Sequence, residues 1–222
     1  EQPPQFHPEG DVFKHTRIML EMLPAEASLP LVLSVLFHDI GKPPTSAVDE
    51  EGRIRFNGHD RVGAEMTEAI MERLRFSRAE IEATVEAVRQ HMVFKDVPNM
   101  RVAKLKRFMA RPTFNDELEL HRVDCASSHA MMDNYEFLLT KKDEFANEPI
   151  IPPPLVRGDD LIALGLEPGP KFGEILEAVE TRQLEGALRD RKEAIEWVKG
   201  EYSLGEEEKK RPTPNVQRPT SN

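Results

Sequence analysis

SLPLVLSVLFHDIGKPP, residues 28–44, is the stretch that decides the fold of this chain. Ser28 can cap the start of a helix whose first turn holds a proline, and Gly41 followed by two prolines predicts its end. The residues between are apolar almost all round, which predicts the central, buried helix of a helical fold. His38 and Asp39 then lie at the mouth of the most apolar helix.

His38 and Asp39 are neighbours, so on a regular helix their side chains point about 100° apart. They can share one metal only where the chain leaves helical geometry, and we expect Gly41 to allow this by adopting a positive φ. A histidine at a helix C-terminus is favoured by the helix dipole and needs no metal. A carboxylate there is disfavoured without a cation, so Asp39 is the stronger indication of a metal site.

Helical periodicity continues through most of the chain, and we predict an all-α fold. A short alternating stretch, residues 53–56, interrupts it, and the segment from Asn115 could stay helical to Asn147 with or without a kink. Further helices are expected to begin after Asp11, near His59, after Ser77, near Asn99, at Asn115 or Asp116, near Lys171 and after Asp190.

Domain organisation follows from composition. The proline-rich residues 149–154 are typical of a stiff linker. We therefore predict a helical-bundle domain over residues 1–148 and a C-terminal helical extension over residues 149–202. Residues 203–222 lack apolar content and are predicted to be a disordered tail. The start at Glu1, without a methionine, suggests an excised fragment.

Composition restricts the class of protein. The net charge of −10 over 222 residues argues against a wholly basic nucleic-acid binder. A single cysteine, Cys125, excludes an intramolecular disulfide and fits a reducing compartment. The longest apolar run, residues 29–37, is too short to cross a bilayer, and no signal peptide is visible. We expect a cytoplasmic protein without a membrane partner, and the sequence leaves its oligomeric state open.

Residues of metal-ligand type recur along half of the chain in the order H…HD…H…H…D, which suggests one site assembled from several segments. His15 and His91 each lie on the inward face of their predicted helix. For either one alone, a core histidine bonded to a backbone carbonyl is the better explanation. Two such histidines beside a His-Asp pair favour a shared metal. The predicted ligands are His15, His38, Asp39, His59, His91 and Asp124.

Two of these ligands are weaker when taken singly. Asp124 lies among small residues that allow helices to approach closely, but contact with solvent would also explain it. His59 follows Gly58 at a predicted helix start and could equally be a surface residue. His121 and His129 flank Asp124 outside the pattern and are expected to have no role, and His7 stays ambiguous.

HDIGKP, residues 38–43, resembles the signature of the HD superfamily of metal-dependent phosphohydrolases. Three further stretches narrow the resemblance: FHPEGDVFKHT (residues 6–16), GRIRFNGHDRVGAE (residues 52–65) and LGLEPGPKFGEILEAVE…QLEG (residues 164–186). Together they are similar to the C-terminal, HD-containing half of bacterial tRNA nucleotidyltransferases, the CCA-adding and poly(A) polymerase family. The resemblance covers most of residues 6–200.

This resemblance implies a hydrolase acting on phosphate esters of nucleotides or RNA ends, such as 2′,3′-cyclic phosphates. In that family nucleotidyl transfer belongs to an N-terminal head with a Gly-Ser-type loop and paired aspartates. Neither is found in this sequence, so the chain alone is not expected to add nucleotides. The competing prediction is a non-catalytic, tRNA-binding body of a CCA-adding enzyme, in which the metal would serve structure.

The resemblance also implies a distribution of ligands around one or two divalent metals. One metal would be held by His15, His38, Asp39 and Asp124, and a second by His59 and His91, with Asp39 bridging. Mn, Fe, Co or Ni suit such a mixture better than Mg or Ca. Asp39 and Lys42 are the predicted catalytic residues, Lys42 as a cation facing the phosphate; a solvated helix-end lysine is the alternative.

A basic cluster stands out in this acidic chain at roughly helical spacing. It could contact the phosphates of an RNA, with a nucleotide or RNA 3′ end, including that of tRNA, as the predicted partner. A solvated helix face is the alternative. The predicted RNA-binding residues are Arg101, Lys104, Arg107 and Arg111, with Lys106 beside them.

Overall fold

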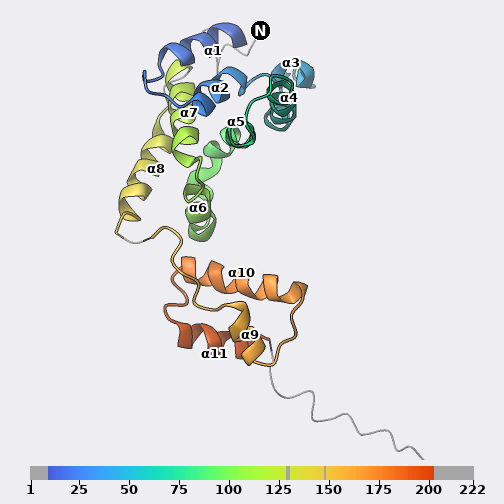
Figure 1. The fold of residues 1–222 in the computed structure, drawn as a ribbon. Helices are drawn as coiled ribbons and strands as arrows, with labels where there is room; N and C mark the ends of the chain where they lie inside the picture. The colour runs from blue at the N-terminus through green and yellow to red at the C-terminus, as the bar shows by residue number, and fades with distance from the viewer. Residues whose placement is uncertain (1–9, 129–130, 148, 203–222) are drawn as a thin grey trace, which may run out of the picture. The chain divides into compact units, whose positions relative to one another are not determined.

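The computed structural model describes residues 10–128, 131–147 and 149–202. The chain forms two compact units, Glu1–Ile151 and Pro152–Asn222, and both are built mainly of helices (Figure 1). The all-α prediction is confirmed. The first unit contains α1 (Val12–Glu21), α2 (Leu29–Phe37), α3 (Lys42–Thr45), α4 (His59–Arg73), α5 (Arg78–Gln90), the 3₁₀ helix η1 (His91–Asn99), α6 (Val102–Met109), α7 (Phe114–Ser127) and α8 (Asp133–Glu144). The second contains α9 (Gly158–Ala163), α10 (Pro170–Leu184) and α11 (Arg191–Glu201).

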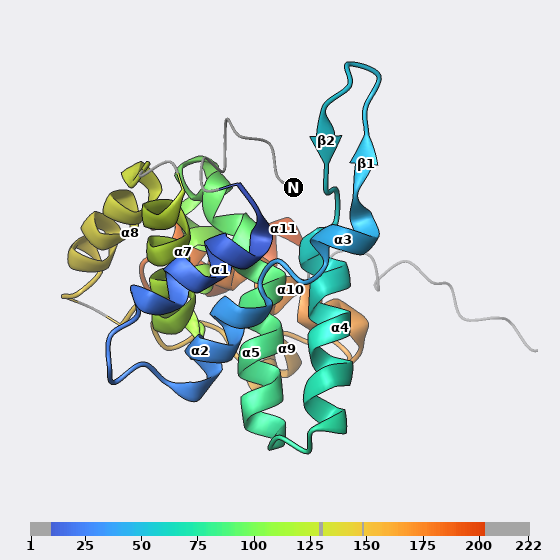
Figure 2. The same ribbon diagram turned by 90° about the horizontal axis from the view of Figure 1, so that it is seen from above.

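Helix α5 organises the first unit. It packs against α2 on one side and α4 on the other, and it also contacts α7 (Figure 2). Apolar side chains from α1, α2, α5 and α7 form one of the buried clusters of this unit. Its members are Met19, Leu31, Val35, Ala87, Leu120 and Val123. Among the described helices, none is both long and apolar enough to span a bilayer.

Helix α2 is not the fully buried helix that its composition predicts. Leu31 and Val35 are buried, whereas Leu29 is 48% exposed and Leu36 is 45% exposed. The helix contacts α1, α5 and α7. Among the described residues, none of these neighbours covers the face with Leu29 and Leu36. The prediction of a central helix is therefore wrong in this respect, and α5 has that place.

Four of the predicted helix starts are confirmed by side-chain caps. Asp11 accepts a hydrogen bond from the Lys14 amide, and Ser28 caps α2 with the proline inside its first turn. Ser77 opens α5 with a complete capping box, and Asp190 caps α11. These side chains satisfy amides that have no partner within their helix.

Two helix boundaries differ from the prediction. The basic helix α6 has Arg101 at its N-cap, because Asn99 is the last residue of η1, a 3₁₀ segment that the periodicity did not indicate. The long segment expected from Asn115 to Asn147 is two helices, since α7 ends at Ser127 and α8 begins at Asp133.

A small hairpin connects α3 to α4 and projects from the helices (Figure 2). Its antiparallel strands are β1 (Ala47–Val48) and β2 (Ile54–Arg55), with Ala47 opposite Arg55. The side chain of Asp49 closes the turn by accepting hydrogen bonds from the backbone amides of Glu51 and Arg53. The alternating stretch at residues 53–56 thus contains a strand.

The second unit has its own apolar core, drawn from α9, α10, α11, the segment before α9 and the connection between α10 and α11. The boundary between the units, at Ile151 and Pro152, falls within the proline-rich residues 149–154. The predicted disordered tail, residues 203–222, lies outside the described residues. The buried residues in the core of the second unit are Val156, Leu161, Ile175, Val179, Leu188, Ala194 and Val198.

Candidate metal centre

Six side chains from five segments of the first unit meet at one place. Two groups of three offer ligand atoms that lie within 4.8 Å of one another, and Asp39 belongs to both. The first group is His15, His38 and Asp39, and the second is Asp39, His59 and His91. Asp124 adjoins the first group, because its Oδ1 lies 3.1 Å from His15 Nε2. The structure thus brings together the residues of the predicted pattern, from α1, the turn after α2, α4, η1 and α7.

The end of α2 places the His-Asp pair. The helix ends at Phe37, and the next residues form a turn that leads to α3. Gly41 has a φ of −79°, so the predicted positive φ is wrong. It serves close approach instead: a Cβ at this position would overlap the carbonyl oxygen of His59 and lie 2.6 Å from the amide nitrogen of Gly63. The missing side chain lets the start of α4, and with it His59, reach the cluster.

The backbone fixes which nitrogen of three histidines faces the cluster. In each ring Nδ1 lies beside the carbonyl oxygen three residues earlier, at 2.9 Å for His38, 2.8 Å for His59 and 2.6 Å for His91. A carbonyl oxygen can only accept, so Nδ1 carries the proton and donates. In the neutral ring Nε2 then presents its lone pair, as in metal-ligating histidines that donate their other nitrogen to the backbone.

The lone pairs meet at distances that favour a cation. His59 Nε2 lies 3.1 Å from His91 Nε2, and the buried Nε2 of His38, which makes no hydrogen bond among the described residues, lies 3.3 Å from Asp39 Oδ2. Burial lowers the pKa of His59, and burial together with the charge of His38 lowers the pKa of His91 to about 4. Neither ring holds a second proton at neutral pH. A divalent ion would satisfy these nitrogens, and a donor set of imidazole and carboxylate fits such an ion.

Asp39 lies at the centre with its charge retained. Burial alone would raise its pKa, but the neighbouring charges of His38 and Lys42 hold it well below the usual range. Lys42 Nζ, itself buried, lies 2.6 Å from Asp39 Oδ2, and His59 Nε2 lies 3.6 Å from Oδ1. The same carboxylate raises the pKa of His38, against the effect of burial.

The side chain of Asp124, on α7, contacts His15 of α1. Burial would raise its pKa, yet the hydrogen bond from His15 and the charges of His38 and His15 lower it. His15 Nδ1 lies 3.3 Å from Ser127 Oγ, so both nitrogens of this ring contact α7. The side chain of Asp124 therefore stays ionised beside the cluster and is available as a ligand.

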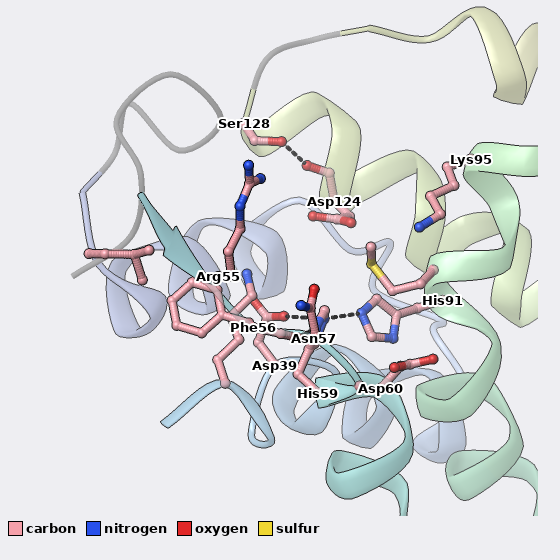
Figure 3. A pocket seen from close by; sticks show the side chains of 14 residues that line it. Asp39, Arg55, Phe56, Asn57, His59, Asp60, His91, Lys95, Asp124 and Ser128 are labelled. Carbon is pink, nitrogen blue, oxygen red and sulfur yellow. Dashed lines mark hydrogen bonds and ion pairs between the residues drawn. The ribbon is translucent and has the colours of Figure 1, made fainter. Parts of the chain in front are cut away.

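A cavity of about 430 Å³ opens onto this cluster. Asp39, His59, His91 and Asp124 contribute to its lining, and side chains from the end of the hairpin and from η1 form other parts of it (Figure 3). Its volume is within the usual range of small-molecule sites, roughly 300–1,000 Å³.

Two cationic residues of this cavity, Arg55 and Lys95, were not predicted as site residues. Arg55 ends β2, inside the alternating stretch, and Lys95 lies on η1, four residues after His91. The alternation did contain a signal, because it places Arg53 and Arg55 on the same face of a strand.

The predicted RNA-binding residues lie elsewhere, since none of them lines the cavity. Arg101 and Lys104 are exposed on or beside α6, and Arg107 is half-buried. Arg111 is different: its guanidinium pairs with the buried Glu117, lies 3.4 Å from Glu86 and packs over a phenylalanine ring.

The remaining histidines lie outside the cluster or outside the described part of the chain. His121 is buried and stacks against Phe94, with ring centroids 4.8 Å apart. His7 and His129 are not among the described residues.

Comparisons with known proteins agree with this architecture. A family model described as HD domain matches residues 11–144, and one described as tRNA nucleotidyltransferase domain 2 matches residues 143–198. An A-adding tRNA nucleotidyltransferase from Deinococcus radiodurans is 35% identical over 202 residues, which are 85% of this chain and 46% of that protein. A CC-adding tRNA nucleotidyltransferase from Thermus thermophilus is 36% identical over 76% of this chain and 39% of its own length.

A multifunctional CCA protein from Halorhodospira halophila is 39% identical over a shorter stretch, 41% of this chain. No solved structure matches. The chain spans less than half the length of these relatives. Because the HD model alone matches more than half of the chain, the protein belongs to the HD domain family and is related to the HD-containing part of CCA-adding tRNA nucleotidyltransferases, as the sequence resemblance predicted.

Proposed function

We propose that this chain is a metal-dependent phosphohydrolase that acts on phosphate esters of nucleotides or RNA ends, such as 2′,3′-cyclic phosphates. The observation that carries the proposal is the orientation of three buried histidines. Their Nδ1 atoms donate to backbone carbonyls, so their Nε2 atoms converge beside the ionised Asp39. A buried cluster of this kind, open to a cavity, suits metal-assisted hydrolysis better than a structural role alone.

A divalent ion held here supplies Lewis-acid activation of water and of the phosphoryl group. His15, His38, Asp39 and Asp124 would hold one ion, and Asp39, His59 and His91 would hold a second. Mn, Fe, Co and Ni fit this donor set better than Mg or Ca. One or two ions are compatible with the two groups of ligands.

The protein's own side chains prepare the site. Lys42 keeps Asp39 ionised and oriented through the 2.6 Å ion pair. Burial keeps the rings of His59 and His91 neutral, which is the state that can bind a metal. In the proposed reaction water adds to phosphorus, one P–O ester bond breaks, and the alcohol leaves with a proton. Lys42 is the proposed catalytic cation beside the phosphate.

The test compares Asp39→Ala with a matched exposed carboxylate, Asp96→Ala, which lies on η1 outside the cavity lining. Each protein is incubated with Mn²⁺ or Ni²⁺ and with bis-p-nitrophenyl phosphate or 2′,3′-cyclic AMP, and bound metal is measured by mass spectrometry. We expect Asp39→Ala to lose bound metal and at least about a hundredfold in turnover. Asp96→Ala should retain both. Absence of metal-dependent turnover by the unmodified chain on either substrate would contradict the proposal.

A second candidate function is a tRNA-binding body without chemistry of its own. The relatives named as tRNA nucleotidyltransferases and the match to domain 2 of that family favour it. Arg101, Lys104 and Arg107 would contact tRNA phosphates. Arg111 suits this role less well, because two carboxylates already neutralise it.

This candidate is tested with the double variant Arg101→Glu, Lys104→Glu, against a control in which the exposed Arg73 and Arg89 are reversed. Filter binding of tRNA at several salt concentrations is the measurement. Loss of two phosphate contacts should weaken binding and reduce the salt dependence by about one unit of slope per residue. Equal effects of both double variants would exclude α6 as a specific tRNA contact.

A further inference from the structure

We propose that Arg55, oriented by Asp49, binds a second phosphate of the substrate, next to the one held at the metal cluster. The cavity would then select an oligonucleotide end or a nucleoside bisphosphate over a nucleotide with a single phosphate. This inference rests on the proposed function in one respect, because it takes a phosphate ester to be the ligand of the cluster.

One nitrogen of the Arg55 guanidinium is hydrogen-bonded within the hairpin, and the other two can bind a ligand. Its Nε donates to Asp49 Oδ2 at 2.9 Å, and the side chain is 40% exposed. The two terminal nitrogens make no hydrogen bond or ion pair with the residues that the structure describes. They therefore present the paired donors that match two oxygens of a phosphate.

Asp49 fixes the direction of this arginine. Its carboxylate accepts from the amides of Glu51 and Arg53, and its Oδ2 lies 2.9 Å from Nε of both Arg53 and Arg55. The hydrogen bond from the Arg53 amide is the largest of the effects that lower its pKa, so the carboxylate stays ionised. The hairpin turn and the arginine are thus held by one side chain, which reduces the entropy lost when Arg55 binds a ligand.

Charge on the opposite wall of the cavity supports the same conclusion. Arg55 and Lys95 lie on either side of Asp124 in Figure 3, and both line the cavity. Lys95 has no ion-pair partner within the described part of the chain. Metal ions held by the cluster would neutralise a phosphate bound there, so these cations at the edge suit further negative charge on the same ligand.

The test measures binding of two probes to the full chain with Mn²⁺ by titration calorimetry: adenosine 3′,5′-bisphosphate and 3′-AMP. Chromatography of the recovered probes confirms that they remain intact. We expect the bisphosphate to bind at least about tenfold more tightly, because a second phosphate gains a charge-assisted contact. Arg55→Ala should reduce this ratio to near one, and Asp49→Asn should reduce it in part.

Arg53→Ala is the matched control, since Arg53 shares the Asp49 carboxylate but does not line the cavity. It should leave the ratio unchanged. Arg55→Lys keeps the charge without the paired donors and should give an intermediate ratio, which guards against loss of the hairpin in the alanine variant. If Arg55→Ala weakens both probes equally, Arg55 contacts the phosphate at the cluster and the second subsite does not exist.

The two proposals can fail separately. A chain that hydrolyses none of the test esters, yet shows a binding ratio that depends on Arg55, would retain the second phosphate site and lose the hydrolase function. A chain that hydrolyses these esters, with the same ratio in the unmodified protein and in Arg55→Ala, would retain the function and overturn the subsite.

Discussion

At the scale of single residues, the candidate site depends on the protonation of its imidazole rings. His91 has its pKa lowered to about 4 by burial and by the charge of His38, while an imidazole in the unfolded chain titrates near 6.5. A histidine whose pKa is lowered on folding contributes stability that is complete above pH 6.5. That contribution is lost as the pH falls toward 4, because the unfolded state then binds the proton and the folded state does not.

We therefore expect acid to destabilise the metal-free chain through His91. Its share of the unfolding free energy should fall by about 2 kcal/mol between pH 7 and pH 5. The measurement is urea unfolding in the presence of a chelator, for the unmodified chain and for His91→Gln. The difference between their profiles of unfolding free energy against pH gives the share of His91. His38 and His59 are present in both proteins, so the difference reports His91 together with its coupling to these two rings. Parallel profiles would show that His91 is not held neutral by folding.

Gly41 allows a second prediction at this scale. Gly41→Ala places a methyl group against the backbone at His59 and Gly63. This backbone belongs to α4, so it cannot move without displacing the helix. We expect a loss of about 2–4 kcal/mol in stability and weaker metal binding. Gly173→Ala in α10 is the control, because open space surrounds that position; it should stabilise its helix by about 0.5–1 kcal/mol. Calorimetry of both variants checks the pair, and equal effects would contradict the packing argument.

At the scale of elements, the start of α5 is a feature that sequence and structure describe in the same way. Ser77 accepts from the Glu80 amide, and the Glu80 carboxylate accepts from the Ser77 amide. Ser77→Ala should cost about 1 kcal/mol of unfolding free energy in urea. Ser46→Ala, at an exposed serine, should change it by less than about 0.5 kcal/mol. No difference between the two would mean that this cap is not important for stability.

The elements that sequence predicts well are those whose cause is local. Caps such as Ser77 and Asp190 act within one turn, so their helix starts could be found without the fold. The 3₁₀ segment that begins at His91 and the break between α7 and α8 depend on the residues that pack around them, and periodicity contains no such information. The role of Gly41 was misassigned for the same reason, because its neighbour is an atom of α4 and not of its own turn.

The site shows the same division between local and tertiary information. The order of histidines and aspartates was sufficient to name the cluster, since each residue is a metal-ligand type in a family pattern. Arg55 and Lys95 could not be named, because the hairpin and η1 meet at the cavity only in three dimensions. The spacing of basic residues along a helix also does not predict that Arg111 forms an ion pair with Glu117.

At the scale of the whole molecule, the chain has two units with separate apolar cores. The candidate ligands all belong to the first unit. In differential scanning calorimetry we expect two transitions, of which Mn²⁺ raises only one. At a metal concentration of about 100 times the dissociation constant, the stabilisation of that unit should reach about 2.7 kcal/mol. A single transition would show that the units unfold together, and a shift of both transitions would show that metal binding is coupled to the second unit.

The ion pair between Lys42 and Asp39 has a consequence for how the chain comes to fold. Its ammonium acts as a resident counter-ion, so the central carboxylate is not left uncompensated when metal is scarce. We therefore expect assembly of the polypeptide to be separate from the supply of the ion, with the apoprotein reaching its native packing first and binding the ion afterwards. A relative that lost some of its ligands could keep the architecture for the same reason, with the lysine standing where the metal's charge had been.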